Sequence, residues 1–191
     1  MPDSNTTIVE ETQAAARGLL ALVMGDRAAP RHFTFTQAGL VTSFIAVLVV
    51  TAIELVATAA LGAGHMFSSL IQSAVVYAAV LGTSAVYLRQ ISRWDALVPF
   101  IVTLNWANAT LSLVMLVTVL LGLSFLGFLF LIVGVVVSIN IARLVMTLKP
   151  LQIVVLIIAQ VVGLIAAVLL LVMLFPPTPQ QLAAIQAAAN S

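Results

Sequence analysis

The chain has 191 residues, of which 63% are hydrophobic and only 7% are charged, and its formal net charge is +1. Soluble domains carry about 25% charged residues, so this composition excludes a soluble globular protein. Seven basic residues are too few for the basic surface that nucleic-acid binding requires, and the absence of cysteine excludes disulfides, thiolate metal sites and cysteine nucleophiles. The composition is that of an integral membrane protein.

Residues 1–36 are predicted to form a cytoplasmic amphipathic segment and a linker. The sequence Thr-Ile-Val-Glu at residues 7–10 matches a capping box, which predicts a helix over residues 8–24. Apolar side chains recur along it at steps of three and four residues. Such a helix either lies on the inner leaflet or packs on the cytoplasmic ends of the spanning helices, and the sequence leaves both arrangements open.

Five apolar runs follow, each long enough for a helix that crosses the bilayer. They are predicted at residues 38–61, 66–88, 96–121, 125–146 and 151–175. One uninterrupted helix over residues 96–146 would extend roughly 75 Å, more than twice the ~30 Å of hydrocarbon, so Gly122-Leu123-Ser124 is the predicted turn. Pro150 suits the first position of the last helix, because proline lacks the amide that would have no partner there.

The predicted fold is therefore all-α: a polytopic transmembrane bundle of five spans in residues 37–175. An outer tail over residues 176–191 follows, with a short alanine-rich helix expected after Thr178. The basic residues all lie before the first span, between the second and third, or around the link from the fourth to the fifth: Arg17, Arg27, Arg31, Arg89, Arg93, Arg143 and Lys149. The positive-inside rule makes that side cytoplasmic, which places the amino terminus inside and the carboxyl terminus outside.

Glu54 is the only ionisable residue well within a predicted span. An isolated charge at the bilayer centre costs about 2.5–3.5 kcal/mol on insertion scales, so we expect Glu54 to be neutral or to have a partner. Thr51 and Thr58 lie on the same helical face. One interpretation is a protonated carboxyl that makes an interhelical hydrogen bond, and the other is a proton- or cation-responsive site.

The third span carries the most polar stripe of the bundle: Asn105, Asn108 and Ser112 are spaced three and four residues apart. Together with Glu54 they form the candidate intramembrane polar site. The structural interpretation is hydrogen bonding between helices, at about 0.6 kcal/mol for each bond. The functional interpretation is a lining for a small polar ligand or a lipid headgroup.

Two further groups of residues are candidates for contacts with other molecules. In the second span Ala74, Ala78 and Gly82 form a small-residue face, which predicts close helix packing or dimerisation without deciding between them. At the cytoplasmic interface four cations either determine the topology or bind anionic lipid headgroups: Arg89, Arg93, Arg143 and Lys149. Arg143 is expected to extend to the interface or to pair with a carboxylate such as Asp95.

Residue patterns typical of catalysis are absent from the sequence. It contains no glycine-rich phosphate loop, no Gly-x-Ser-x-Gly elbow and no His-Glu-x-x-His pair. The two histidines, His32 and His65, fall on opposite sides of the predicted membrane and so do not share a site. We expect no enzyme activity, no catalytic or metal site and no cofactor.

The five spans, the very short outer turns and the segment Ile-Ala-Arg-Leu-Val-Met-Thr-Leu-Lys-Pro-Leu-Gln at residues 141–152 resemble the Ypt-interacting protein (YIP) superfamily, particularly its small bacterial members. This resemblance implies a five-span membrane protein, and it covers residues 38–175. Eukaryotic members act in membrane traffic through small GTPases and partner proteins. This chain has a shorter cytoplasmic segment, and only Arg143 is carried over, as a structural residue.

Three classes of function fit these features. The first is a noncatalytic scaffold or accessory subunit of a membrane assembly, with other membrane proteins or a second copy of the chain as partners. The second is a protein that binds or organises membrane lipids. The third is a small transporter or channel, although five spans do not divide into equal halves. One lysine beside six arginines suggests a bacterial source and hence the inner (cytoplasmic) membrane.

Overall fold

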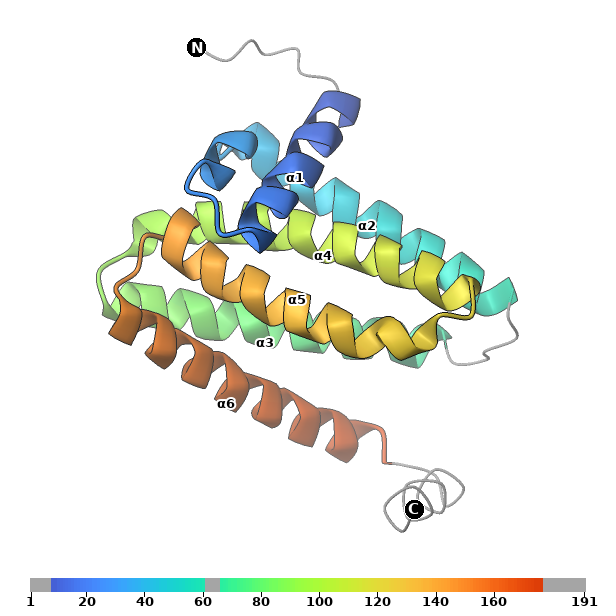
Figure 1. Cartoon of the computed structure of the whole chain (residues 1–191). Coiled ribbons are helices and arrows are strands. Elements are labelled where there is room, and N and C mark those ends of the chain that lie inside the picture. Colours follow the sequence, from blue (N-terminus) through green and yellow to red (C-terminus); the bar gives the residue numbers. More distant parts are fainter. Residues whose placement is uncertain (1–7, 61–65, 177–191) are drawn as a thin grey trace.

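The computed structural model describes residues 8–60 and 66–176, which form helices joined by short connections (Figure 1). Five of these helices are long and apolar enough to cross a membrane, which confirms the predicted multi-pass helical fold. The α-helices are α1 (Ile8–Val23), α2 (Gln37–Ala60), α3 (Met66–Gln90), α4 (Leu97–Leu120), α5 (Gly127–Asn140) and α6 (Pro150–Leu174). Three predicted features lie outside the described residues: the cap at Thr7, the turn at residues 62–65 and the helix after Thr178.

The helix bounds differ from the predicted ones by a few residues, and the connections contain extra helical turns. α5 continues into a π-helix over Ile141–Val145, and short 3-10 helices occupy Trp94–Ala96 and Ser124–Leu126. The predicted turn holds Gly122 at φ +74°, a conformation that glycine adopts without strain. Pro150 is the first residue of α6 as expected, and the amide of Lys149 donates to Gln152 Oε1 over 2.9 Å.

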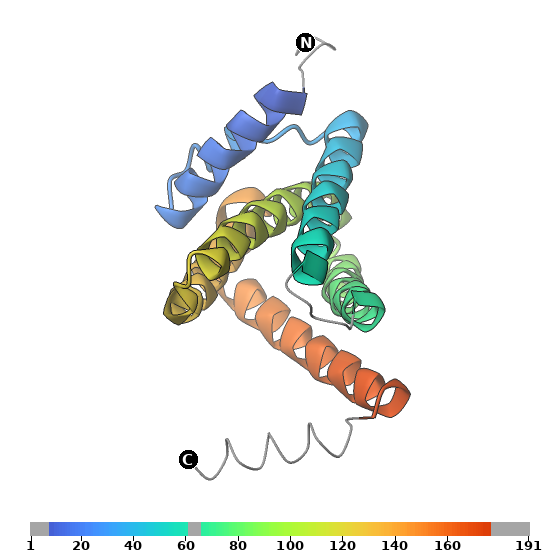
Figure 2. The same cartoon turned by 90° about the vertical axis from the view of Figure 1, so that its right-hand side faces the viewer.

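α2 packs along α4, α3 packs along α6, and α5 lies beside α4 (Figures 1 and 2). We call the end at which α3 and α5 finish and α4 and α6 begin the basic end. Every lysine and arginine of the chain lies in α1, in the segment between α1 and α2, or at the basic end of the spanning helices. The charge asymmetry predicted from the sequence therefore coincides with one end of the folded bundle.

The buried core is concentrated at the basic end. Its large side chains come from the end of α3, the first half of α4, the π-helix and the start of α6, and include Leu88, Phe100, Trp106, Ile141, Met146 and Leu156. Towards the opposite end the helices expose mostly apolar side chains, such as Val56, Leu121 and Phe128. A surface of this kind suits hydrocarbon as its solvent.

α1 packs on the bundle, which is one of the two arrangements that the sequence left open. Its buried residues are Ala15, Gly18, Leu19, Ala21 and Leu22. A Cβ atom added to Gly18 would lie 2.6 Å from Cζ of Phe33, so only glycine allows this close approach. Asn140 at the end of α5 donates from Nδ2 to the carbonyl of Leu22 over 2.7 Å. The predicted linker between α1 and α2 also contains a 3-10 helix, Ala29–His32, which packs against α1.

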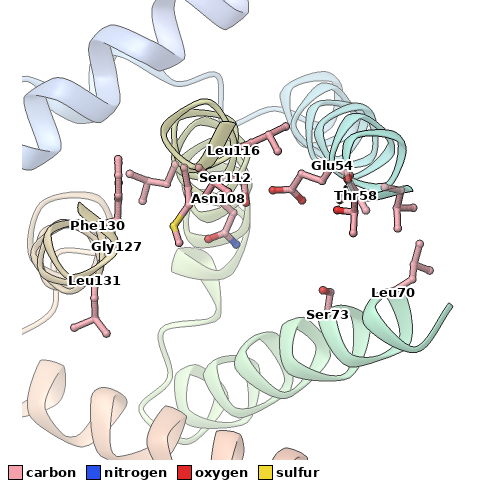
Figure 3. Close-up of a pocket in the computed structure, with 15 residues that line it drawn as sticks. Glu54, Thr58, Leu70, Ser73, Asn108, Ser112, Leu116, Gly127, Phe130 and Leu131 are labelled. Carbon is pink, nitrogen blue, oxygen red and sulfur yellow. Dashed lines mark hydrogen bonds between the residues drawn. The ribbon is translucent and has the colours of Figure 1, made fainter. Parts of the chain in front are cut away.

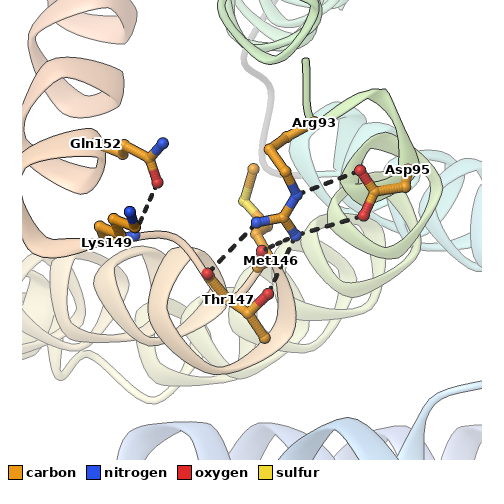
Figure 4. Close-up of polar contacts among 6 residues, drawn as sticks. All are labelled: Arg93, Asp95, Met146, Thr147, Lys149 and Gln152. Atoms are coloured by element: carbon orange, nitrogen blue, oxygen red, sulfur yellow. Dashed lines mark hydrogen bonds and ion pairs between the residues drawn. The ribbon is translucent and has the colours of Figure 1, made fainter. Parts of the chain in front are cut away.

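Arg93 joins the two connections of the basic end (Figure 4). Its guanidinium donates to the carboxylate of Asp95, with Nε 3.2 Å from Oδ1, and to the carbonyl of Met146 over 2.8 Å. It also contacts the carbonyl and hydroxyl of Thr147. Of the two expectations for Arg143, pairing with Asp95 is not what the structure shows: Asp95 pairs with Arg93, two residues away. The side chain of Arg143 is exposed on the π-helix, and its extension to the interface stays a prediction.

The contact between α3 and α6 depends on small and polar residues. A Cβ atom added to Gly163 would lie 2.4 Å from Cγ2 of Thr83. Gln160 Nε2 donates to Ser84 Oγ over 2.9 Å, and the hydroxyl of Tyr87 donates to the carbonyl of Gln152 over 3.0 Å. Both bonds attach α6 to α3. The bond between Gln160 and Ser84 lies deeper in the predicted spans, where water does not compete for it, and the bond of Tyr87 lies next to the basic end.

Candidate intramembrane cavity

A cavity of about 770 Å³ lies between α2, α3, α4 and α5 (Figure 3). Its lining residues come from the half of each helix that is remote from the basic end, as the positions 51–58, 70–73, 108–119 and 127–131 show. The lining combines apolar side chains with six polar ones: Thr51, Glu54, Thr58, Ser73, Asn108 and Ser112. The cavity is therefore amphipathic and lies within the predicted spans.

Glu54 supplies the only carboxyl group among the residues that line the cavity. It lies six residues before the end of α2, which places it roughly 9 Å from that end. Its side chain points from α2 towards α4 in Figure 3. Thr58 donates its hydroxyl to the backbone carbonyl of Glu54 over 2.7 Å. Over residues 8–60 and 66–176, no side chain or backbone group makes a hydrogen bond or ion pair with the Glu54 carboxyl.

Four other polar side chains of the cavity share this property. Within the described part of the chain, Thr51, Ser73, Asn108 and Ser112 have no side-chain hydrogen-bond partner. A polar group in hydrocarbon without a partner costs several kcal/mol. Five such groups line one open cavity, where water or a polar part of a ligand would supply partners for them. This requirement distinguishes the cavity from an ordinary gap between packed helices.

Asn105, the fourth residue of the predicted polar site, is separate from the cavity. It is fully buried, accepts a hydrogen bond at Oδ1 from the hydroxyl of Tyr77, and donates from Nδ2 to Ser43 Oγ over 3.1 Å. Ser43 in turn donates to the carbonyl of Leu40 over 2.8 Å. Asn105 thus connects α2, α3 and α4, whereas Asn108 and Ser112, one and two turns further along α4, line the cavity.

Comparison with known proteins adds no relative. No family model, curated protein or solved structure matches this chain. The resemblance to the YIP superfamily therefore stays a prediction, and the function is argued from the cavity and the surfaces alone.

The four candidate cations do not converge on one site. Arg93 is occupied by Asp95 and by carbonyl groups, while Arg89, Arg143 and Lys149 are exposed. Three exposed cations near an interface are consistent with topology determinants. No group of three His, Asp or Glu side chains that could hold a metal ion occurs in residues 8–60 and 66–176.

The predicted small-residue face of α3 does not pack inside the molecule. Ala74 and Ala78 are exposed, and no atom of another residue lies within 4 Å of a Cβ added to Gly82. The close contact of α3 is made instead by Thr83 and Ser84, on the neighbouring face that meets α6. No part of residues 8–60 and 66–176 covers the face formed by Ala74, Ala78 and Gly82, which leaves it open to lipid or another protein.

Sequence reasoning missed Ser73, Tyr77 and Ser43. Single serines and tyrosines are common in spanning helices, so their residue type gave no reason to select them. Their common feature is their position: Ser73 faces the cavity across from Glu54, and Tyr77 lies one turn further along α3, opposite Asn105. The sequence could have identified them only through their depth, because each lies at about the same depth in the membrane as a polar residue on another predicted span.

Proposed function

We propose that this chain is a noncatalytic integral membrane protein that binds an amphiphilic molecule, a lipid or another small amphiphile, in the cavity between α2, α3, α4 and α5. The observation that carries the proposal is the convergence of five polar side chains without protein partners on one cavity inside the spans. The polar end of an amphiphile would supply their hydrogen bonds, and its apolar part would contact side chains such as Leu116 and Phe130.

The transporter interpretation has less support from the architecture. The five spanning helices are continuous in the region of the cavity, and α4 and α5 are joined by a short turn. Transporters typically place broken helices at the binding site, because the free backbone groups of those helices contact the substrate. A binding role requires no such break.

The test measures the melting temperature of the purified full chain in a neutral detergent with added amphiphiles of three headgroup types: a monoacylglycerol, an alkylphosphocholine and an alkylamine. At about 100 times the dissociation constant, binding stabilises a protein by ~2.7 kcal/mol, which corresponds to a rise of roughly 5–10 °C for a chain of this size. We expect at least one of the three to produce a saturable rise.

Ser112→Leu should reduce this rise, because the larger apolar side chain narrows the cavity and removes a polar group. Val114→Leu is the matched control, since Val114 lies on the same helix, is exposed and does not line the cavity. Equal shifts for the wild type and Ser112→Leu, or no shift with any of the three amphiphiles, would contradict binding in this cavity.

A second role, as a scaffold or accessory subunit, is supported by the uncovered small-residue face of α3. Small residues let helices of two subunits approach closely, so Ala78→Leu should convert an oligomer into a folded monomer. The measurement is the detergent-corrected mass together with the melting temperature. Unchanged mass would show that this face meets lipid and would remove the support for the scaffold role.

We further propose a bacterial inner membrane as the location and a distant relationship to the small bacterial members of the YIP superfamily. Support for the location comes from residue usage, with a single Lys beside six Arg, and support for the relationship comes from five spans with a short link into the last one. Fractionation of bacterial membranes that contain the chain tests the location.

A further inference from the structure

Resting on the proposed function, we infer that the cavity selects amphiphiles whose polar end carries one positive charge, with the carboxylate of Glu54 as the counter-ion. The ligand class is a hydrophobic monocation, such as an amine or a quaternary ammonium or phosphonium ion with apolar substituents. This assigns a charge to the ligand, which the proposed function leaves open.

The first argument is the sign of the charges. Glu54 is the only acidic or basic residue in the cavity lining. Its carboxyl group has no hydrogen-bond or ion-pair partner in residues 8–60 and 66–176. All seven basic residues lie elsewhere: in α1, in the segment after it, or at the basic end, whereas the cavity lies in the opposite halves of the helices. An anionic headgroup would meet a carboxyl group and no cation. A cation would neutralise Glu54 at a site where screening by water is weak.

The second argument is the nature of the other lining groups. Phe130 of α5 is among the residues that line the cavity, and an aromatic ring attracts a cation that approaches its face. Met115 of the neighbouring helix α4 adds a polarizable thioether. The side-chain oxygens of Asn108, Ser112 and Ser73 are free to accept hydrogen bonds from an ammonium group. Each of these groups accommodates a positive charge without supplying a negative one.

The third argument is against a bare divalent cation, calcium or magnesium, as the occupant. Calcium requires six to eight oxygen ligands, usually with several carboxylates, and magnesium requires a near-octahedral set. The lining has one carboxyl group and nine residues without a polar side chain around a volume of about 770 Å³. Its hydroxyl and amide groups come from three different helices. A space of this size with apolar walls suits an organic cation, whose substituents fill the volume.

The experiment uses two probes of matched shape and opposite charge, tetraphenylphosphonium and tetraphenylborate. Binding of each probe to the purified full chain in neutral detergent is measured by equilibrium dialysis, with empty micelles subtracted. We expect saturable binding of tetraphenylphosphonium and at least roughly tenfold weaker binding of tetraphenylborate. Comparable affinities for the two ions would overturn the inference, and this comparison needs only the wild-type chain.

The variants test the role of Glu54. Glu54→Gln keeps the size of the side chain and removes the charge, so it should lose roughly tenfold or more in affinity for tetraphenylphosphonium, whereas Glu54→Asp should retain the preference for the cation. Size exclusion establishes that each variant is folded. Unchanged affinity in folded Glu54→Gln would overturn the role of this carboxyl.

The outcomes also separate this inference from the proposed function. If the monoacylglycerol or the alkylphosphocholine raises the melting temperature in a manner that depends on Ser112, but tetraphenylphosphonium does not bind, the cavity is a binding site and the cation selectivity is wrong. If no amphiphile and neither ion binds in a manner that depends on Ser112 or Glu54, both proposals fail.

Discussion

Asn105 and Asn108 show how one helical turn changes the role of the same side chain. Asn105 is fully buried and hydrogen-bonded to Tyr77 and to Ser43, so its amide connects three spanning helices. Asn108 lines the cavity and has no partner in the described residues. The three-residue step turns Asn108 by about 60° from the direction of Asn105, and that rotation moves the amide from a helix contact into the cavity.

We therefore predict that Asn105→Ala destabilises the bundle by roughly 1–2 kcal/mol, because it removes the acceptor of the Tyr77 hydroxyl and the donor to Ser43 Oγ. Asn108→Ala is the control and should change the stability by much less, since no protein hydrogen bond is lost. Denaturant titration of both variants measures the difference. Equal losses for the two would contradict separate roles.

At the scale of the helix pair, the contact between α3 and α6 depends on the absence of a side chain at Gly163. α6 packs mainly on α3, and Thr83 occupies the space that a Cβ at position 163 would need. Gln160 and Ser84 are hydrogen-bonded across the same interface. Gly134 in α5 provides a contrast, because no atom lies within 4 Å of an added Cβ there.

Gly163→Ala should destabilise the protein by roughly 1–3 kcal/mol, because the added methyl group overpacks the interface with Thr83. Gly134→Ala should be neutral or stabilising by up to about 1 kcal/mol, since alanine favours the helix and meets nothing. Melting temperatures of the two variants provide the measurement. A double variant, Gly163→Ala with Thr83→Ser, should recover part of the loss, and no recovery would show that Thr83 is not the obstacle.

At the scale of the whole molecule, the basic end has the buried core, the packed α1 and the Arg93 contacts, while the opposite half has the cavity and exposed apolar surface. The two halves therefore differ in how closely they are packed as well as in charge. A well-packed end fixes the positions of the helices, and the opposite halves are left with room for a ligand.

The orientation of this asymmetric molecule is predicted from its charges: the basic end should face the cytoplasm. A reporter that is active only outside the cytoplasm should be active when fused after Ser191 and inactive when inserted near Ser92. Expression of each fusion is checked by immunoblotting. An active fusion at Ser92 would reverse the predicted orientation.

The sequence by itself determined the number and approximate bounds of the spans. Hydrocarbon offers no partner to a backbone amide or carbonyl, so any chain that crosses it must do so as an apolar helix of about 20 residues, and five such runs are visible along this chain. The turn at Gly122 and the start of α6 at Pro150 followed from local chemistry in the same way. The sequence also identified Glu54, Asn108 and Ser112 as polar residues at depth.

Only the tertiary structure decided which of these side chains meet. Helical periodicity gives the direction of a side chain on its own helix, but the neighbour in that direction depends on how the helices pack. Hence Glu54 of α2 shares a cavity with Asn108 of α4, Asn105 bonds with Tyr77 instead, and Asp95 pairs with Arg93 rather than Arg143. The small-residue face at Ala78 is uncovered for the same reason: α6 packs on the adjacent face of α3, where Gly163 admits Thr83.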